Sequence, residues 1–214
     1  MKRIECLIAL LFLLFSCGHK KEISFLPFYN SPDLTPQWLS ESEEEGAHSI
    51  SRFTLTNQDG KAVTNESVSG KICIANFFFT ACGGICPKMM HHLKKVQQAF
   101  AGDTALLFLS HSVLPEMDSI PRLNRYAKQM QLDTRNWWLL TGDRDEIYTL
   151  ARRSYFADEA TGYNKNNREF LHTENCVLVD RKGRIRGIYN ATLELEMEKL
   201  IRHIRILKEE EAVE

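Results

Sequence analysis

The chain of 214 residues lacks several features that would assign it to a protein class at once. Its 27 lysines and arginines nearly balance its 28 aspartates and glutamates, so the net charge is only −1. The basic residues do not gather in a stripe with aromatic ones, which argues against a nucleic-acid-binding surface. No apolar run approaches the ~20 residues that a membrane-spanning helix needs. There is no repeat and no low-complexity tract, so the length predicts one domain with a real core.

The first residues are typical of an export signal. Met1-Lys2-Arg3 is a short basic head, a short apolar stretch runs from Leu7 to Phe15, and a small residue, Ser16, precedes Cys17. Leu14-Phe15-Ser16-Cys17 also resembles the bacterial lipobox, in which the cysteine becomes the lipidated first residue of the mature protein. We therefore expect a lipoprotein signal peptide at 1–16, with Cys17 as the lipidation site. The alternative is a plain cleaved signal with an incidental cysteine. The expected location is the periplasmic side of a membrane.

Composition divides the rest of the chain into a tether, a domain and a tail. Residues 17–48 contain three prolines and an acidic run at 41–45, with no sustained period, and are expected to be a tether. Residues 26–30 and Trp38 are apolar enough to dock on the domain. The domain is expected at 49–208, and 209–214 is a charged tail.

Hydrophobic periodicity predicts an N-terminal hairpin, three strand–helix units, a second hairpin and a last helix. The expected strands are residues 51–56, 61–63, 71–79, 104–110, 137–140, 175–180 and 184–189, and the expected helices are 87–100, 120–132, 143–153 and 192–208. This order predicts an α/β domain with a central mixed β-sheet flanked by helices. A pair of thiols at a strand-to-helix junction makes it a thioredoxin-like fold with an N-terminal β-hairpin extension.

Cys82 and Cys86 are the most informative residues, because they follow an apolar strand and precede a helix. Pro87 disfavours the helical conformation for the residue before it, so we expect Cys86 to be the N-cap and Pro87 the first helical residue. The free N–H groups and dipole of that helix then favour a thiolate at this point. Gly83 and Gly84 let the loop fold tightly enough for the two thiols to face each other.

Two facing thiols can close into a disulfide or bind one soft metal ion, and their spacing alone does not choose between these. Thioredoxin-type oxidoreductases hold two residues between their cysteines, whereas Cys82 and Cys86 are separated by three. Two thiolates select Cu(I), or zinc in a tetrahedral site, and a mononuclear site needs a third donor. His172 is the strongest candidate, because the loop before strand 175–180 returns to the cysteine end of a thioredoxin-type sheet.

Residues 79–87, with the run Cys82-Gly83-Gly84-Ile85-Cys86-Pro87, resemble the signature of the Sco/SenC family of copper proteins. That family assembles the dinuclear copper centre of cytochrome c oxidase. Residues 114–121, 137–143 and the segment from His172 to 183 also match, so the resemblance covers about residues 50–207. It implies that Cys82, Cys86 and His172 are ligands of Cu(I) and Cu(II), and that the cysteines can cycle through a disulfide. One departure is Leu171, because the family usually has an acidic residue before the ligand histidine.

The sequence thus predicts a membrane-tethered copper chaperone whose partner is the copper-bearing subunit of cytochrome c oxidase. The main alternative is a thiol–disulfide oxidoreductase that reduces the copper-ligand cysteines of the partner, which needs Cys82 and Cys86 but not His172. A peroxidase is a weaker alternative, because the surroundings of Cys86 lack the usual peroxidase pattern.

Several other residues that could bind metal are expected to have ordinary structural roles. Cys73 and Cys176 lie in apolar strands and are expected to be buried, inert thiols. Residues 89–92, Met-Met-His-His, are expected to be helix surface and core. His111 is expected to be structural. Asp118 matches a position of the family and is expected near the site.

Overall fold

The computed structural model describes residues 25–157 and 173–212. The predicted signal peptide, Cys17, Leu171 and His172 lie outside the described residues. The described strands are β1 Thr54–Asn57, β2 Ala62–Thr64, β3 Ile72–Phe78, β4 Leu106–Ser112, β5 Trp137–Thr141, β6 Asn175–Val179 and β7 Ile185–Asn190. The described helices are α2 Glu41–Glu44, α3 Asn65–Val68, α4 Ile85–Ala99, α5 Ile120–Gln129, α6 Arg144–Thr149, the π-helix η2 Leu150–Ser154 and α7 Glu194–Glu210.

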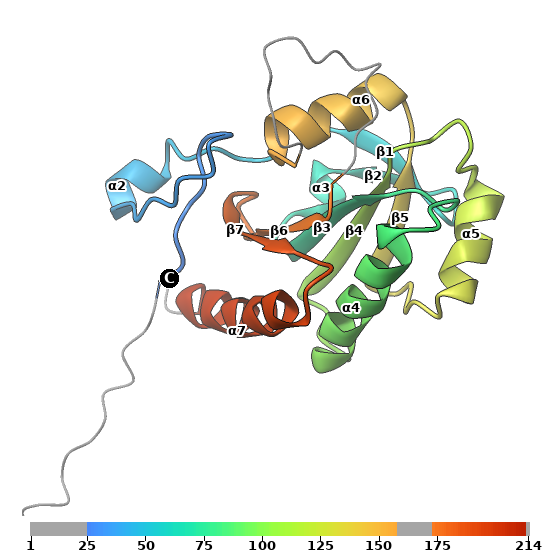
Figure 1. Cartoon of the computed structure of the whole chain (residues 1–214). Coiled ribbons are helices and arrows are strands. Elements are labelled where there is room, and N and C mark those ends of the chain that lie inside the picture. The colour runs from blue at the N-terminus through green and yellow to red at the C-terminus, as the bar shows by residue number, and fades with distance from the viewer. Residues whose placement is uncertain (1–24, 158–172, 213–214) are drawn as a thin grey trace, which may run out of the picture.

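The strands form one mixed sheet in the order β2-β1-β5-β4-β3-β6-β7 (Figure 1). The three central strands β3, β4 and β5 are parallel, and the remaining neighbours pair antiparallel. Every residue of β3 and β4 is buried, as a continuous apolar strand covered on both faces should be. The two predicted hairpins are present as β1–β2 and β6–β7.

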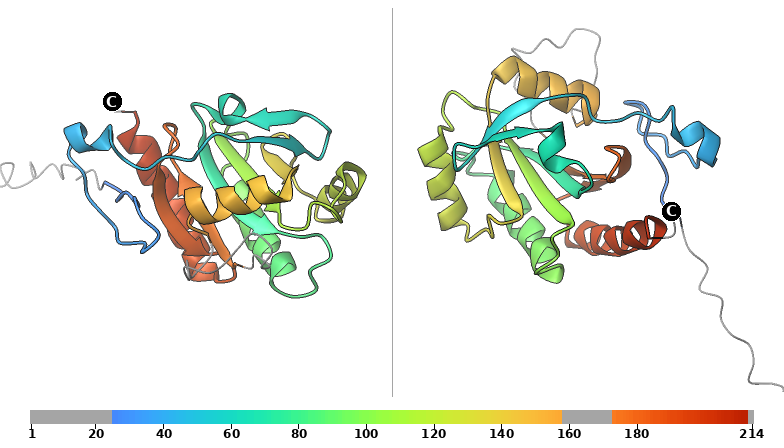
Figure 2. Two further views of the ribbon diagram at one scale, coloured as in Figure 1. Left: turned by 90° about the horizontal axis from the view of Figure 1, so that it is seen from above. Right: turned by 180° about the vertical axis from the view of Figure 1, so that it is seen from behind.

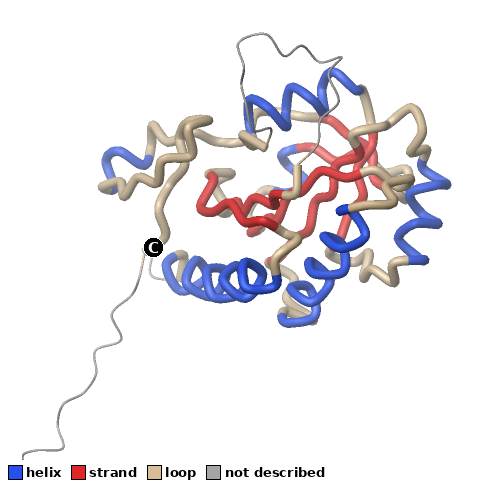
Figure 3. The backbone as a smooth tube through the Cα atoms, in the orientation of Figure 1, coloured by secondary structure: helices blue, strands red, loops and turns tan. Residues whose placement is uncertain are grey.

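Helices cover both faces of the sheet, as the views from above and behind show (Figure 2). Side chains of α4, α5 and α7 pack with alternate residues of β3, such as Ile74 and Phe78, in one apolar core. Side chains of α6 and η2 pack with the intervening residues, such as Ala75 and Phe77, in the other. Figure 3 shows the same arrangement, with the strands between the two groups of helices. The predicted mixed sheet flanked by helices is confirmed.

Several elements differ from the sequence prediction in their limits or type. The predicted helix 143–153 is α6 followed by the π-helix η2, with Asp143 as the N-cap that accepts a hydrogen bond from Glu146 N. The acidic run 41–45, expected to lack regular structure, contains the one-turn helix α2. The last helix reaches Glu210, which is 7% exposed, so the predicted charged tail begins inside α7.

Part of the predicted tether contacts the domain. Leu26 and Phe28 are each 4% exposed, as the docking prediction for residues 26–30 requires, whereas Trp38 is 67% exposed. The guanidinium of Arg186 lies over the Phe28 ring at 4.0 Å. The Leu26 N–H donates to the carboxylate of Glu210, so the first described residues lie beside the C-terminus (Figure 1).

A buried ionic cluster, here called the ionic clamp, holds this junction. It consists of Asp180, Arg184, Arg186 and Glu210, with Glu44 from α2. Arg186 Nη2 donates to Glu210 Oε2 at 2.7 Å, and Arg184 Nε donates to Asp180 Oδ2 at 2.7 Å. Because the clamp joins β6–β7, α7 and the N-terminal segment, it fixes this edge of the domain.

In the described part of the chain, no helix has the length and apolar character needed to cross a membrane.

Candidate metal centre

The two predicted site cysteines lie where β3 gives way to α4. The Cys82 N–H donates to the Phe79 carbonyl at 3.2 Å, which turns the chain back after the strand. The helix α4 begins at Ile85 with Gly84 as its N-cap, so Cys86 lies in the first turn. The prediction that Cys86 is the N-cap was therefore wrong. The first N–H groups of any helix have no intrahelical partner, so Pro87 fits there without losing a hydrogen bond.

This early helix start directs the free N–H groups of α4 at Cys82. Partial burial alone would raise the pKa of the Cys82 thiol, but the N–H and thiol of Cys86 and the N–H groups of Gly84 and Ile85 outweigh it and lower that pKa. The residue is partly exposed. Cys82 is thus the cysteine that the helix N-terminus favours as a thiolate. The expectation that placed the thiolate at Cys86 was wrong, because it assumed a later helix start.

Cys86 has the opposite environment. The residue is 3% exposed and belongs to the core beneath α4. Burial raises the pKa of the Cys86 thiol to about 12, opposed by the Phe79 N–H and reinforced by the neighbouring Cys82. The site therefore pairs an accessible, acidic thiol with a buried one that holds its proton. Both cysteines are free thiols in the structure.

Asp118 holds the loop that leads into the cysteines. This carboxylate is 1% exposed and accepts hydrogen bonds from the Thr80 N–H at 3.1 Å, the Thr80 hydroxyl and the Ser112 hydroxyl at 2.6 Å. Arg122 Nε donates to Thr80 Oγ1 at 2.6 Å from the other side. Asp118 contacts Thr80, which lies two residues before Cys82, so it positions the thiol loop instead of facing the sulfurs as a ligand.

Tyr126 is a site residue that the sequence analysis missed. Its ring packs against Phe78 with centroids 5.4 Å apart, in the core that also contains Cys86. Burial raises the pKa of the Tyr126 hydroxyl, and charges on Cys86, Cys82 and Asp118 raise it further. The signal that could have found it is spacing, because Arg122 and Tyr126 lie four residues apart on one side of α5, and Asp118 lies four residues before Arg122, just ahead of that helix.

The other two cysteines do not join the site. Cys73 is 4% exposed and Cys176 is fully buried, as predicted. Burial raises the pKa of Cys73 to about 12 and raises that of Cys176 as well. His111 is also fully buried, between the rings of Phe77 and Tyr155, and burial lowers its pKa to about 4.

The histidines and methionines of α4 do not form a metal site with the thiols. Met89, Met90 and His92 are buried, and His92 Nδ1 hydrogen-bonds to the Ala191 carbonyl at 3.0 Å. Over residues 25–157 and 173–212, no group of three or more histidine, cysteine or acidic side chains is placed to hold a metal ion. Cys82 and Cys86 supply two soft sulfur donors, which suit Cu(I).

The antiparallel strand β6 brings the chain next to His172 to the thiol end of the sheet. Its register pairs Cys176 with Asn76 of β3. Phe79 and Thr173 each lie three residues beyond this pair, toward the same end of the sheet. Thr173 is 5% exposed, so it is part of the packed domain.

Comparison with known proteins now identifies the family. Residues 41–209 match the SCO1/SenC family. The chain belongs to this family.

Its structure is similar to a SCO1/SenC family lipoprotein of Bacillus anthracis, with 28% identity and a TM-score of 0.66 over 75% of this chain and 95% of that one. It is similar to BsSco, described as a member of the Sco family of cytochrome c oxidase assembly proteins with a disulfide switch, with 30% identity and a TM-score of 0.63 over 74% and 92%. It is also similar to copper-bound ScoI of Bradyrhizobium japonicum, with 28% identity and a TM-score of 0.58 over 73% and 99%.

The SCO1/SenC match confirms the thioredoxin-like fold that was predicted from the element order together with the thiol pair at a strand-to-helix junction. It covers β3, α4 and β6, and therefore both cysteines and the residue number at which the third ligand was predicted. The ligand assignment itself stays a prediction, because His172 lies outside the described residues.

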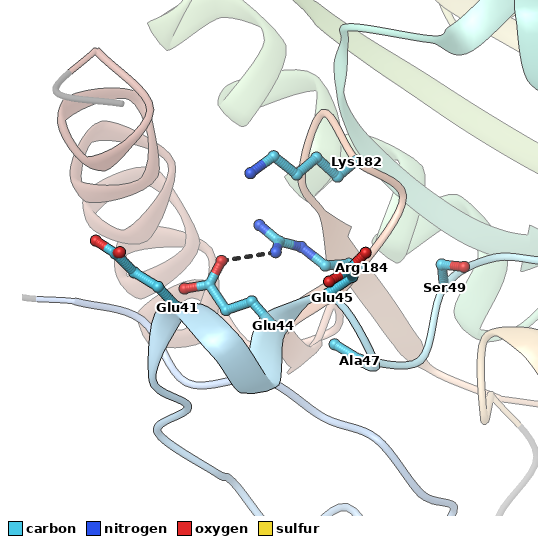
Figure 4. A pocket seen from close by; sticks show the side chains of 7 residues that line it. All are labelled: Glu41, Glu44, Glu45, Ala47, Ser49, Lys182 and Arg184. Carbon is cyan, nitrogen blue, oxygen red and sulfur yellow. Dashed lines mark hydrogen bonds and ion pairs between the residues drawn. The ribbon is translucent and has the colours of Figure 1, made fainter.

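A hollow elsewhere on this SCO1/SenC domain has no thiol or imidazole among its lining residues, so it does not resemble the thiol site. It measures about 610 Å³ and lies between α2 and the β6–β7 turn, with the ion pair of Arg184 and Glu44 across it (Figure 4). The β6–β7 turn follows Val179, which pairs with Cys73 near the start of β3, so the hollow is at the opposite end of the sheet from the thiols. Its lining residues are Glu41, Glu44, Glu45, Ala47, Ser49, Lys182 and Arg184, which include no thiol or imidazole.

Proposed function

We propose that this protein is a copper chaperone that delivers copper to the copper-bearing subunit of cytochrome c oxidase. The observation that carries the proposal is the pair of unlike thiols, Cys82 and Cys86, at the N-terminus of α4. Two relatives support it: ScoI of Bradyrhizobium japonicum has copper bound, and BsSco belongs to a family of cytochrome c oxidase assembly proteins.

The proposed ligands are Cys82, Cys86 and His172. The position of Thr173 supports the third, because it lies at the thiol end of the sheet and consecutive Cα atoms are ~3.8 Å apart. With two thiolates and a neutral imidazole as ligands, the site has a net charge of −1 when it holds Cu(I) and of zero when it holds Cu(II). Both net charges are electrostatically tolerable.

The two sulfurs have different tasks in loading and release. Cys82 is partly exposed and its thiol has the lower pKa of the two, so it is the sulfur that more readily offers a thiolate to incoming copper. Cys86 must lose its proton when it binds, because metal ligands are deprotonated. In transfer, thiolates of the partner displace these ligands one at a time, beginning at the exposed Cys82 side.

Membrane attachment is also part of the proposal. Cys17 would carry the lipid, and residues 17–48 would connect it to the domain at 49–208 on the periplasmic side. The similar protein of Bacillus anthracis is described as a lipoprotein, which supports this arrangement.

The test is an anaerobic copper titration of the purified protein in detergent, beside His172→Ala. The matched control is His91→Ala, which removes an exposed histidine from α4. We expect visible sulfur-to-Cu(II) charge-transfer bands and tight Cu(I) binding in the original protein and in the control. Both should be weakened strongly in His172→Ala. An absence of tight copper binding in all three proteins would overturn the proposal.

A second function, thiol–disulfide exchange, is favoured by the inequality of the thiols. The Cys82 thiolate would attack a disulfide of the partner, form a mixed disulfide and release one partner thiolate. Cys86 would lose its proton, attack the Cys82 sulfur and release the second thiol, which leaves Cys82 and Cys86 oxidised and the partner reduced. The disulfide switch described for BsSco is consistent with this chemistry. Equal reductase activity in the original protein and His172→Ala, with no tight copper binding in either, would favour this function.

A further inference from the structure

Tyr126 has a buried hydroxyl group. Burying it costs free energy, and no contact within the described residues offsets that cost. The residue is 8% exposed, and its oxygen has no hydrogen-bond partner within the described part of the chain. Buried hydroxyl groups in proteins are nearly always hydrogen-bonded, and one left alone loses its bonds to water without replacement. A phenylalanine would fill the same apolar space without this cost. The hydroxyl therefore needs an explanation that packing does not supply.

The surroundings of this hydroxyl point to the thiols. Tyr126 belongs to the same apolar core as Cys86, and Cys82 packs against that core. Charge on Cys86 acts on the hydroxyl more strongly than charge on Cys82 or Asp118. One turn earlier in α5, Arg122 contacts the loop before Cys82 through Thr80. The side of α5 that carries Arg122 and Tyr126 thus lies against the thiol loop and the core that contains Cys86.

We propose that Tyr126 is a positioning residue that donates a hydrogen bond to the Cys86 sulfur once that sulfur is a copper-bound thiolate. In the structure this hydroxyl makes no bond to a sulfur of the described residues, and a protonated thiol sulfur is only a weak acceptor. A thiolate accepts a charge-assisted hydrogen bond, which is the stronger kind. The inference rests on the proposed copper site and adds a residue that would stabilise its buried ligand.

Two consequences follow from such a bond. The donated hydrogen draws electron density from the sulfur, so it raises the energy of the sulfur-to-Cu(II) charge transfer. It also offsets the cost of a buried thiolate charge, so it increases copper affinity. Both effects require copper on the Cys86 sulfur, so neither is expected in the metal-free Cys82–Cys86 disulfide couple.

The experiment compares Tyr126→Phe with the original protein and with the control Tyr189→Phe. Tyr189 lies in the same apolar core, but its hydroxyl already bonds to His203 Nδ1 at 2.8 Å. We expect the charge-transfer band of Tyr126→Phe to move to lower energy and Cu(I) affinity to fall about tenfold, as loss of an outer hydrogen bond at a metal site does. The equilibrium constant of the Cys82–Cys86 disulfide with a dithiol buffer should stay within about twofold. Tyr189→Phe should keep the original band and affinity.

The outcomes separate this inference from the proposed function. If the original protein binds copper and Tyr126→Phe keeps its band position and affinity, the tyrosine has no such role and the chaperone proposal stands. Equal changes in Tyr126→Phe and Tyr189→Phe, or a disulfide constant that shifts with the copper affinity, would show a general packing effect and overturn the inference. If the original protein does not bind copper, the proposed function fails and this inference fails with it.

Discussion

The two ends of β3 carry two clusters of chemically reactive or charged side chains, and these clusters are built in opposite ways. Near the start of β3, the ionic clamp matches each buried charge with an opposite charge, such as Arg186 with Glu210. At the other end, the thiol loop leaves Cys82 partly exposed, Cys86 protonated and the Tyr126 hydroxyl without a partner in the described residues. Groups that satisfy one another hold the structure together, whereas groups that still lack a partner can bind one. The contrast separates a structural cluster from a candidate functional one.

The sharpest way to break this comparison is to remove single sulfurs. Cys82→Ser and Cys86→Ser should each lower Cu(I) affinity by more than ~100-fold, because loss of a ligand costs more than loss of an outer hydrogen bond. Cys176→Ser, at a fully buried position in β6, should leave copper affinity unchanged. Competition titrations with a Cu(I) chelator measure all three. Equal losses in the three variants would mean that the thiol end has no special role.

Alkylation of the reduced, metal-free protein tests the inequality of the two thiols. The pKa of Cys82 is lowered, so this thiol loses its proton at a lower pH than an ordinary thiol, whereas burial raises the pKa of Cys86 to about 12. At pH 8, iodoacetamide should therefore modify Cys82 at least ~100-fold faster than Cys86, because the thiolate is the nucleophile. The difference should narrow as the pH approaches the Cys86 value. Peptide mass spectrometry at timed intervals gives both rates, and similar rates at pH 8 would contradict the assigned environments.

At the ionic clamp, Arg186→Met should reduce stability and leave copper binding intact. Removing one partner from a buried ion pair costs about 3–5 kcal/mol, since the other charge remains buried. The control Lys95→Met removes an ion pair with Glu194 that is exposed on both sides, and should cost about 0–1 kcal/mol. Urea unfolding measures both. If Arg186→Met lowers the free energy of unfolding by less than ~1 kcal/mol, or markedly lowers copper affinity, the two ends of β3 do not differ in the way stated.

The smallest effect concerns the support of the thiol loop. The two carboxylate oxygens of Asp118 accept three hydrogen bonds, and Asp118→Asn leaves only one oxygen to accept them. The loop before Cys82 should therefore loosen. We expect Cu(I) affinity to fall about tenfold and stability to fall by about 1–3 kcal/mol. Asp133→Asn, at a largely exposed pair with Arg135, is the control. Unchanged affinity in Asp118→Asn would limit this carboxylate to a role in folding.

Much of the architecture could be predicted from the residues in order. The apolar runs at β3 and β4 predicted buried strands, and the turn before Lys61 predicted the first hairpin, because strand burial and turn chemistry are local signals. The pair Cys82 and Cys86 was found for the same reason, since both residues lie in one short segment. The helix start was misplaced by two residues, because the preference before Pro87 is weaker than the fit of a whole first turn.

The amino-acid sequence by itself determined that two thiols stand at a strand-to-helix junction of a mixed sheet, because hydrophobic period and residue identity are encoded along the chain. Only the tertiary structure decided which thiol is acidic and which is buried, since burial and the direction of free N–H groups depend on packing. It also brought Asp118 to the loop before Cys82, and Tyr126 of α5 into the core that contains Cys86. Contacts between distant segments follow from how the helices pack on the sheet, and no local pattern contains that information.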